Sequence, residues 1–227
     1  DGCLDVAETA GVGHVASVLS HDLRNPLDVA KAHLRAARET GETEHFDAVA
    51  SAHDRMGQII RDVLMLARGH SAIDTVEDCS LQAAFMDAWH SVDTERATLN
   101  RTAPLPTTTA DPDRVRRLFE NLIRNSVEHG VTGAEKPVAD SPEASSTDTP
   151  PEVTVSVGTL PDGFYVADDG PGVPPDDQDA VFKPGYSTAE TGTGLGLAIV
   201  EKIGAAHGWD VTLTTAQNGG ARFEVRL

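Results

Sequence analysis

The chain of 227 residues is long enough for one large domain or two modest ones, and its pattern favours two. Its formal net charge of −18, from 36 acidic and 18 basic side chains, argues against nucleic acid as the main partner. No run approaches the roughly 18 apolar residues of a membrane-spanning helix, and the N-terminus lacks a secretory signal pattern. We therefore expect a segment without membrane contact of its own. Because Asp1-Gly2-Cys3 is not a typical start, we expect it to be the cytoplasmic part of a longer protein.

Two further features of the composition bear on the environment of the protein. Cys3 and Cys79 lie far apart without neighbouring ligands, so we expect neither a disulfide framework nor a zinc site. The acidic composition, in which arginine outnumbers lysine, favours a salt-rich cytoplasm such as that of a halophilic archaeon, because salt screens self-repulsion. A merely acidic protein from an ordinary organism is the alternative that composition leaves open.

The first third of the chain predicts two helices joined by a short loop at Gly41. Such a hairpin cannot cover its own apolar surface, so we predict a homodimeric four-helix bundle over residues 12–68, with packing on the rest of its own chain as the alternative. His53 falls in the second apolar stripe and is expected to be a core or register residue rather than a second catalytic group. The first stripe comprises Val12, Ala16, Leu19, Leu23, Pro26, Ala30 and Ala37, reinforced by Val15, Leu27 and Leu34. The second comprises Phe46, Val49, His53, Met56, Ile60, Val63 and Ala67.

The first helix carries a histidine in an unusual setting. His21 lies beside Asp22, and Pro26 has no N–H to give to the carbonyl of Asp22, so the helix is expected to loosen nearby. Leu19 and Leu23 lie about 200° around the helix from His21, so their burial would turn the imidazole outward. We interpret His21 as an accessible, reactive imidazole, the alternative being an ordinary exposed histidine before a kink.

The remainder of the chain predicts an α+β two-layer sandwich over residues 76–227, with helices against a mostly antiparallel sheet. Residues 69–80 are polar and aperiodic, and a hinge is placed at 69–75. Residues 131–151 are predicted to be a flexible insertion. The predicted helices lie at 81–89, from Asp111–Pro112 to Gly130, and from the glycine-rich segment to His207. The predicted strands lie near 97–99 and 107–109 and at 153–157, 164–167, 210–215 and 221–227.

The glycine-rich segment GTGLGL, residues 192–197, comes directly before an apolar helix. Glycines let main-chain N–H groups approach phosphate oxygens, and a helix N-terminus favours negative charge, so the segment suits a phosphate chain. No GK[ST] follows, which argues against a Walker loop, and the parallel setting of a dinucleotide site is missing.

Four segments in this order resemble the transmitter of a sensor histidine kinase. They are SHDLRNPL as the histidine box, FENLIRNSVEHG as the asparagine box, and DDGPGV and GTGLGLAIV as the two glycine boxes. VFKPGYST is similar to the phenylalanine box of the nucleotide lid. The resemblance implies a linker at 1–11, a dimerisation and histidine-phosphotransfer hairpin at 12–68, and an ATP-binding domain of the fold shared with gyrase and heat-shock-ninety chaperones.

The resemblance also implies roles for single residues in binding ATP and Mg²⁺. Asn125, assisted by Asn121, would hold Mg²⁺, and Asp168 would accept the exocyclic amine of adenine. Gly170 and Gly172 would give the base room. The residues implied to contact the phosphates or anchor the lid over them are His129, Phe182, Lys183, Gly192, Thr193, Gly194, Leu195, Gly196 and Leu197.

In the implied mechanism His21 attacks the γ-phosphorus, Asp22 acts as general base, and Asn25 orients water when a partner is dephosphorylated. The phosphate then passes to an aspartate of a separate response regulator receiver domain, under control of an upstream sensor domain outside this chain. An ATPase of the same fold is a rival, but the position of its catalytic glutamate holds Asn121. A nucleotide-binding scaffold without turnover also stays open, because Glu128 and Asp169 depart from the family pattern.

Overall fold

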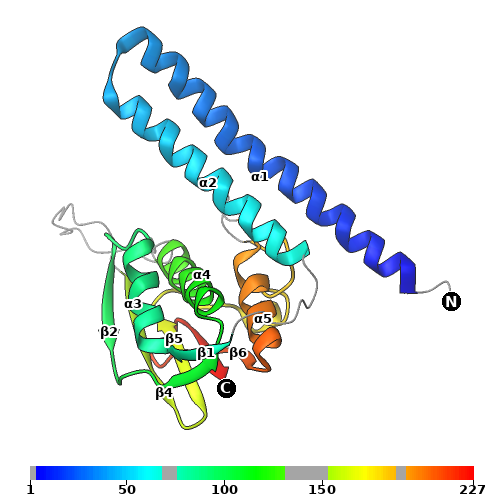
Figure 1. The fold of residues 1–227 in the computed structure, drawn as a ribbon, viewed down its shortest axis with the longest axis vertical. Helices are drawn as coiled ribbons and strands as arrows, with labels where there is room; N and C mark the ends of the chain where they lie inside the picture. Colours follow the sequence, from blue (N-terminus) through cyan, green and yellow to red (C-terminus); the bar gives the residue numbers. More distant parts are fainter. Residues whose placement is uncertain (1–3, 68–75, 131–152, 188–192) are drawn as a thin grey trace, which may run out of the picture. The chain divides into compact units, whose positions relative to one another are not determined.

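The computed structural model describes residues 4–67, 76–130, 153–187 and 193–227, and for residues 4–21 the helical backbone alone. The chain divides into two compact units, residues 1–69 with 183–198 and residues 70–182 with 199–227 (Figure 1). The predicted hinge and the predicted insertion lie outside the described residues. In the part of the chain that is described, no helix combines the length and apolar character needed to cross a membrane.

The predicted helical hairpin is confirmed. Helix α1 (Leu4–Thr40) and helix α2 (Thr43–Ala67) are joined at Gly41, whose φ of 74° and N–H bond to the carbonyl of Ala37 (2.9 Å) end α1. Helix α1 continues through Pro26 without interruption and begins before the expected start at residue 12. Residues 4–11 are therefore helical, because alanine and glutamate there favour helix even without an apolar stripe.

The face of α2 that is buried within the single chain differs from the predicted stripe. The buried residues of α2 are Ala52, Ile59 and Asp62, whereas Phe46 and Ile60 expose 52% and 48% of their surface. His53 is exposed in the single hairpin, and its place in the core of a dimeric bundle stays a prediction. A helix with apolar residues on two adjoining faces does not reveal from periodicity alone which face meets its neighbour.

The second unit confirms the predicted two-layer α+β fold. Its main sheet has five strands, of which one neighbouring pair, β2 and β4, is parallel and the others are antiparallel. Helices α3 and α4 lie against one face of this sheet (Figure 1). In spatial order the strands are β2 (Ala97–Arg101), β4 (Val153–Leu160), β5 (Gly163–Asp168), β7 (Ala221–Arg226) and β6 (Asp210–Thr215). The helices are α3 (Leu81–Ser91), α4 (Pro112–Gly130) and α5 (Gly196–His207), with a short 3₁₀ turn at Pro175–Asp177.

The strand β1 (Glu77–Ser80) was not predicted, because the polar, aperiodic residues up to Ser80 are typical of a hinge. It pairs antiparallel with β3 (Thr107–Ala110) and buries Cys79. Four residues with one buried side chain give too little alternation to be recognised as a strand. Ser80 also caps α3, since its Oγ accepts the N–H of Ala83 at 3.3 Å.

Three phenylalanines form the centre of the second unit. Phe119 of α4 is fully buried and packs edge-on against Phe85 of α3, with ring centroids 5.3 Å apart. On its other side Phe164 of β5 lies at 5.0 Å. These contacts fix α4 on the sheet, next to the strand that ends in Asp168.

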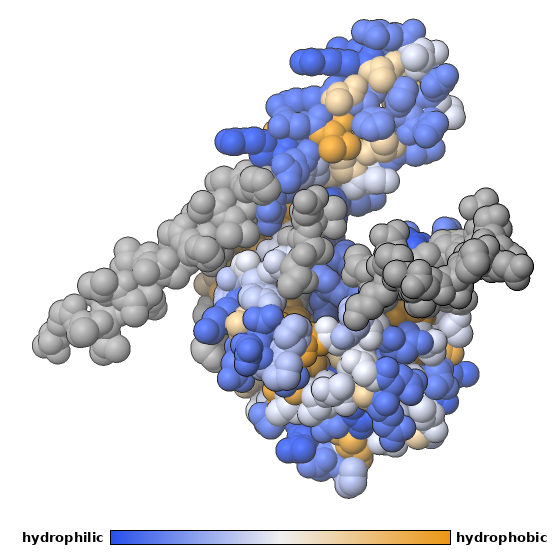
Figure 2. Space-filling model, turned by 180° about the vertical axis from the view of Figure 1, so that it is seen from behind, coloured by the Kyte–Doolittle hydropathy of each residue, from blue (hydrophilic) through white to orange (hydrophobic). Residues whose placement is uncertain are grey.

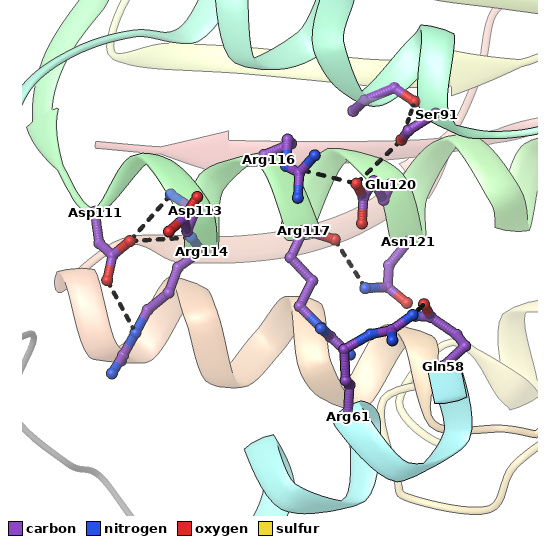
Figure 3. Close-up of polar contacts among 11 residues, drawn as sticks. Gln58, Arg61, Ser91, Asp111, Asp113, Arg114, Arg116, Arg117, Glu120 and Asn121 are labelled. Atoms are coloured by element: carbon purple, nitrogen blue, oxygen red, sulfur yellow. Dashed lines mark hydrogen bonds and ion pairs between the residues drawn. The ribbon is translucent and has the colours of Figure 1, made fainter. Parts of the chain in front are cut away.

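Hydrogen bonds connect the start of α4 to the end of α5. As predicted, Asp111 caps α4: its Oδ1 accepts the N–H groups of Asp113 and Arg114, each at 3.1 Å (Figure 3). The N–H of Asp111 donates to Nε2 of His207 at 3.0 Å, and Nδ1 of His207 lies 2.8 Å from the carbonyl of Ile203. Because Nε2 accepts, the neutral ring carries its proton on Nδ1, and the end of α5 is thereby tied to the start of α4.

Candidate functional site

Asp168 is the last residue of β5 and has 7% of its surface exposed. Its Oδ1 accepts two main-chain hydrogen bonds, from Gly170 and from Ala221, each at 3.1 Å. Main-chain donors on two different segments therefore fix the orientation of the carboxyl group.

The electrostatic setting of Asp168 is that of a buried acid. Burial, the largest cause, raises the pKa of the Asp168 carboxyl above its usual value. The bonds from Ala221 and Gly170 and the nearby Ser126 hydroxyl act in the opposite direction, and the negative charge of Asp169 adds to the rise. A buried acceptor with a shifted pKa, held by the main chain, is suited to receive hydrogen bonds from a ligand.

Glycines surround this carboxyl group closely. A Cβ on Gly170 would lie 2.6 Å from the Cα of Gly130 at the end of α4 and 3.1 Å from Oδ1 of Asp168. Gly172 has a φ of 73°, and a Cβ there would lie 2.5 Å from the carbonyl oxygen of Gly219. The first glycine segment therefore has no room for side chains where it meets the end of α4 and the β6–β7 turn.

The β6–β7 turn is a part of the site that sequence reasoning missed. Asn218, Gly219 and Gly220, between the two closing strands, are typical of an ordinary hairpin turn. Yet a Cβ on Gly220 would lie 2.7 Å from Oδ1 of Asp168, and the N–H of Ala221 donates to that oxygen. The link follows from the antiparallel pairing of β5 with β7, which are separated by more than fifty residues. No local signal in the sequence predicts that pairing.

The two asparagines of α4 have different surroundings. Asn121 is buried, and its Nδ2 donates to the carbonyl of Arg117 at 2.8 Å, one turn earlier in the helix (Figure 3). Asn125 is half-buried and makes no side-chain hydrogen bond to any residue that the structure describes. Asn125 is thus the more available of the two amides for a ligand.

The two residues that depart from the family pattern, Asp169 and Glu128, have definite surroundings, as do two further residues of α4. Oδ1 of Asp169 accepts the N–H of Thr154 at 2.7 Å, which fixes the start of β4. Glu128 and His129 are half-buried in the last turn of α4. Glu120 is held by Ser91 of α3 at 3.0 Å and by Arg116 at 3.7 Å (Figure 3).

The second glycine segment forms a tight turn before α5. Gly194 has a φ of 63°, and a Cβ there would lie 2.6–2.8 Å from the backbone of Gly185 and Tyr186. The N–H of Gly185 donates to the carbonyl of Gly194 at 2.9 Å. The Oγ1 of Thr193 accepts the N–H of Leu195 at 3.4 Å. These bonds hold the turn, and glycine is required at position 194 both for its backbone conformation and for space.

The other residues predicted in this region are placed as follows. Leu195 is buried, Gly196 is the first residue of α5, and Leu197 is half-buried. Gly192 lies outside the described residues. The helix N-terminus that follows the turn leaves main-chain N–H groups available to an anion.

Phe182 and Lys183 begin the predicted lid. The ring of Phe182 meets the ring of Phe223 of β7 edge-on, with centroids 6.4 Å apart. The side chain of Lys183 is exposed. Phe182 therefore anchors the start of this segment to the sheet.

The predicted phosphate acceptor His21 and its neighbours lie in the first helix of the hairpin. His21 is part of α1, but its side chain lies outside the description. Asp22 is half-buried, Asn25 is exposed, and Pro26 is buried.

Comparisons with known proteins bear on both units. The model of the family "Histidine kinase-, DNA gyrase B-, and HSP90-like ATPase" matches residues 110–227, just over half of the chain. The model "His Kinase A (phospho-acceptor) domain" matches residues 12–72.

Curated relatives and solved structures agree with these matches. The sensor histidine kinase ZraS of Escherichia coli O157:H7 is 31% identical over 95% of this chain and 46% of its own length. CpxA of Escherichia coli K12 is 28% identical over 93% of this chain and 46% of its own length. The chain thus spans about half the length of the curated relatives it matches.

Two solved structures resemble the fold. Full-length ShkA, in complex with AMPPNP, has a TM-score of 0.59 and 26% identity, covering 94% of this chain and 45% of that one. The Acinetobacter baumannii histidine kinase AdeS has a TM-score of 0.61 over 91% of this chain and 96% of that one. At 18% identity, AdeS shows a shared fold alone.

Proposed function

Because the chain belongs to the histidine kinase-, DNA gyrase B- and HSP90-like ATPase family, we propose that it is the transmitter of a two-component sensor histidine kinase. It transfers the γ-phosphate of ATP to His21, and from there to an aspartate of a separate response regulator. The observation that carries the proposal is the pairing, in one chain, of a phospho-acceptor domain with an ATPase domain. The similarity to sensor histidine kinases over nearly the whole chain supports it.

In this function Asp168 accepts the exocyclic amine of adenine. Its buried carboxyl, held in place by two main-chain donors, suits a base with an N–H edge. The AMPPNP bound to ShkA supports ATP as the nucleotide. The turn at Gly194 and the start of α5 would contact the phosphates, and Lys183 and His129 are the side chains proposed to join them.

The nucleotide is proposed to bind with Mg²⁺. This ion prefers oxygen ligands and is usually held by one or two protein groups together with substrate phosphates, so the amide oxygen of Asn125 fits. Asn121 would assist, although its amide nitrogen is already bonded within α4. When bound, Mg²⁺ neutralises phosphate charge during transfer.

The phosphoryl transfer needs a nucleophile, a base and in-line geometry. A neutral imidazole nitrogen of His21 attacks the γ-phosphorus, and the bond from that phosphorus to the oxygen of ADP breaks. Asp22 accepts the proton from the other ring nitrogen. Asn25, one turn later in α1, would orient water when the kinase dephosphorylates its regulator.

A homodimer through the hairpin is part of the proposal. The two helices expose large apolar side chains, each with 38–52% of its surface accessible, and Figure 2 shows apolar surface on the hairpin. A second copy that packs on this surface would complete a four-helix bundle. The exposed residues are Leu27, Val29, Leu34, Phe46, Ile60 and Leu64.

The rival ATPase function is less favoured. Its catalytic glutamate would occupy the position of Asn121, and the neighbouring Glu120 is engaged by Ser91 and Arg116. A nucleotide-binding scaffold without turnover differs from a kinase in one observable respect, the absence of phosphate on His21.

We place the domain boundaries as predicted, with a phosphotransfer domain at 12–68 and a catalytic domain at 76–227. A cytoplasmic location follows from the need for ATP and a response regulator. The net charge of −18 leads us to propose adaptation to a salt-rich cytoplasm. Unfolding measured across a KCl series tests this, since a salt-adapted protein gains stability with salt, and an unchanged midpoint speaks against it.

The test of the function is incubation with γ-labelled ATP and Mg²⁺. The wild type should acquire acid-labile label, and His21→Ala and Asn125→Ala should lose it. His90→Ala, which changes an exposed histidine near the end of α3, is the control and should keep the label. Label that survives in His21→Ala refutes the assignment of the acceptor.

A further inference from the structure

Two histidines meet at the closed end of the helical hairpin. His33 lies in α1, two turns before the helix ends, and His45 lies in the first turn of α2. Their Nδ1 atoms are 3.1 Å apart, and the rings are tilted by 60° rather than stacked. At this distance one ring donates a proton to the other. Both residues are half-buried, and the proposed phosphoryl transfer uses neither.

The second ring nitrogen of His45 faces a carboxylate. Its Nε2 lies 3.7 Å from Oε2 of Glu42, which belongs to the turn between the two helices. A carboxylate in this place favours the tautomer that carries its proton on Nε2, so the lone pair on Nδ1 is directed toward His33. Histidines that bind metal ions commonly give their other ring N–H to a carboxylate in this way.

The backbone that carries the two rings is held by hydrogen bonds. The N–H of Gly41 donates to the carbonyl of Ala37 at 2.9 Å, and the N–H of Glu42 donates to Oγ1 of Thr40 at 3.2 Å. That hydroxyl donates to the carbonyl of Ala36 at 3.1 Å. The two ring nitrogens are therefore positioned by helices on either side of a fixed turn, which favours a preformed site over an accidental contact.

The spacing of the two nitrogens matches that of a metal chelate. Metal–nitrogen bonds of about 2.0–2.1 Å separate two imidazole nitrogens by roughly 2.9 Å at a right angle and by roughly 3.3 Å at a tetrahedral angle. The observed 3.1 Å lies between these values. Imidazole suits zinc, copper and nickel, whereas magnesium prefers oxygen ligands. The net charge of −18 attracts a cation of any kind.

We propose that His33 and His45 bind one divalent transition ion, of the class of Ni²⁺, Cu²⁺ or Zn²⁺, which links α1 to α2 at the closed end of the hairpin. Both Nδ1 atoms coordinate the ion in place of the hydrogen bond that now joins them. Among the described residues no group of three histidine, cysteine or acidic side chains could hold an ion, so water completes the coordination. The expected absence of a zinc site rested on the two cysteines, and neither belongs to this pair.

The test is calorimetric titration of the full chain with NiCl₂ at about pH 7.5, because a histidine must be neutral to bind a metal. The wild type should show one Ni²⁺ site per chain, and His33→Ala and His45→Ala should each weaken it by at least about 10-fold. His90→Ala, which changes an exposed histidine of α3, is the control and should keep the wild-type affinity. An excess of Mg²⁺ should not displace the Ni²⁺.

A second measurement needs no variant and therefore does not depend on whether a variant folds. Ni²⁺ is paramagnetic, so less than one equivalent added to the wild type should broaden the NMR signals of residues 33–45 before any others. Broadening that begins elsewhere overturns this inference. So does a wild type that binds no Ni²⁺, or an unchanged Ni²⁺ affinity in both His33→Ala and His45→Ala. The pair includes no residue of the proposed nucleotide site, so each of these results leaves the proposed function standing.

Discussion

Replacing Gly220 with alanine tests whether the position of Asp168 controls nucleotide binding. A Cβ at this position would lie 2.7 Å from Oδ1 of Asp168 and 2.6 Å from its carbonyl carbon, and closer still to its carbonyl oxygen. Ordinary van der Waals contact begins at 3.4 Å. The backbone of Asp168 must therefore move by roughly an ångström to admit one methyl group.

Two energies follow from this displacement. Overpacking of this kind costs about 1–3 kcal/mol of folding free energy. A hydrogen bond from the adenine amine to a charged carboxylate contributes about 1.5–3 kcal/mol, and its loss weakens binding by about 10- to 150-fold. Gly220→Ala should therefore lower both stability and ADP affinity.

The neighbouring Gly219 supplies a control for the loss of stability. Its φ is 95°, so an alanine there costs about 1–2 kcal/mol of backbone strain, while no atom lies within 4 Å of the added Cβ. Gly219→Ala should thus lose similar stability but stay within about twofold of the wild-type ADP affinity. Urea denaturation and ADP calorimetry on both variants separate the two effects. Wild-type ADP affinity in Gly220→Ala would refute the assignment of Asp168 to the nucleotide base.

The further predictions concern three residues of the two units. Burial raises the pKa of Asp168, so above that pKa the charged carboxylate lowers the stability of the folded state. Asp168→Asn should therefore raise the melting temperature of the nucleotide-free protein at neutral pH. The same substitution should abolish ADP binding. In the wild type, ADP affinity should fall as the pH falls through the raised pKa of Asp168, and a flat pH profile by calorimetry would contradict this. Phe119→Ala removes a fully buried ring between Phe85 and Phe164 and should cost about 3–5 kcal/mol in urea denaturation, whereas a loss below about 1 kcal/mol would contradict the described core. Ile60→Glu places a charge on the exposed apolar face of α2 and should convert a dimer to a folded monomer in sedimentation, and a persistent dimer would place the interface elsewhere.

Local signals in the sequence were enough to predict several parts of the fold. The Asp111–Pro112 pair predicts the start of α4, because side-chain capping and a fixed φ act within one turn. The apolar strand that ends in Asp168 is recognisable from its composition alone. Such features depend on residues within a few positions of one another.

The features that sequence reasoning missed depend on distant parts of the chain. The contact of Gly220 and Ala221 with Asp168 arises from the pairing of β5 with β7, which no local pattern encodes. The exposure of His53 and Phe46 depends on which of two apolar faces of α2 meets α1.

The most direct measurement is mapping of the phosphorylated residue after incubation of the full chain with ATP and Mg²⁺, with peptides kept at basic pH to preserve phosphohistidine. Phosphate should be found on His21 in the wild type and be missing in Asp168→Asn, because a nucleotide that is not bound at Asp168 cannot deliver its γ-phosphate. Phosphate on another residue, or undiminished phosphate on His21 in Asp168→Asn, would contradict the central claim.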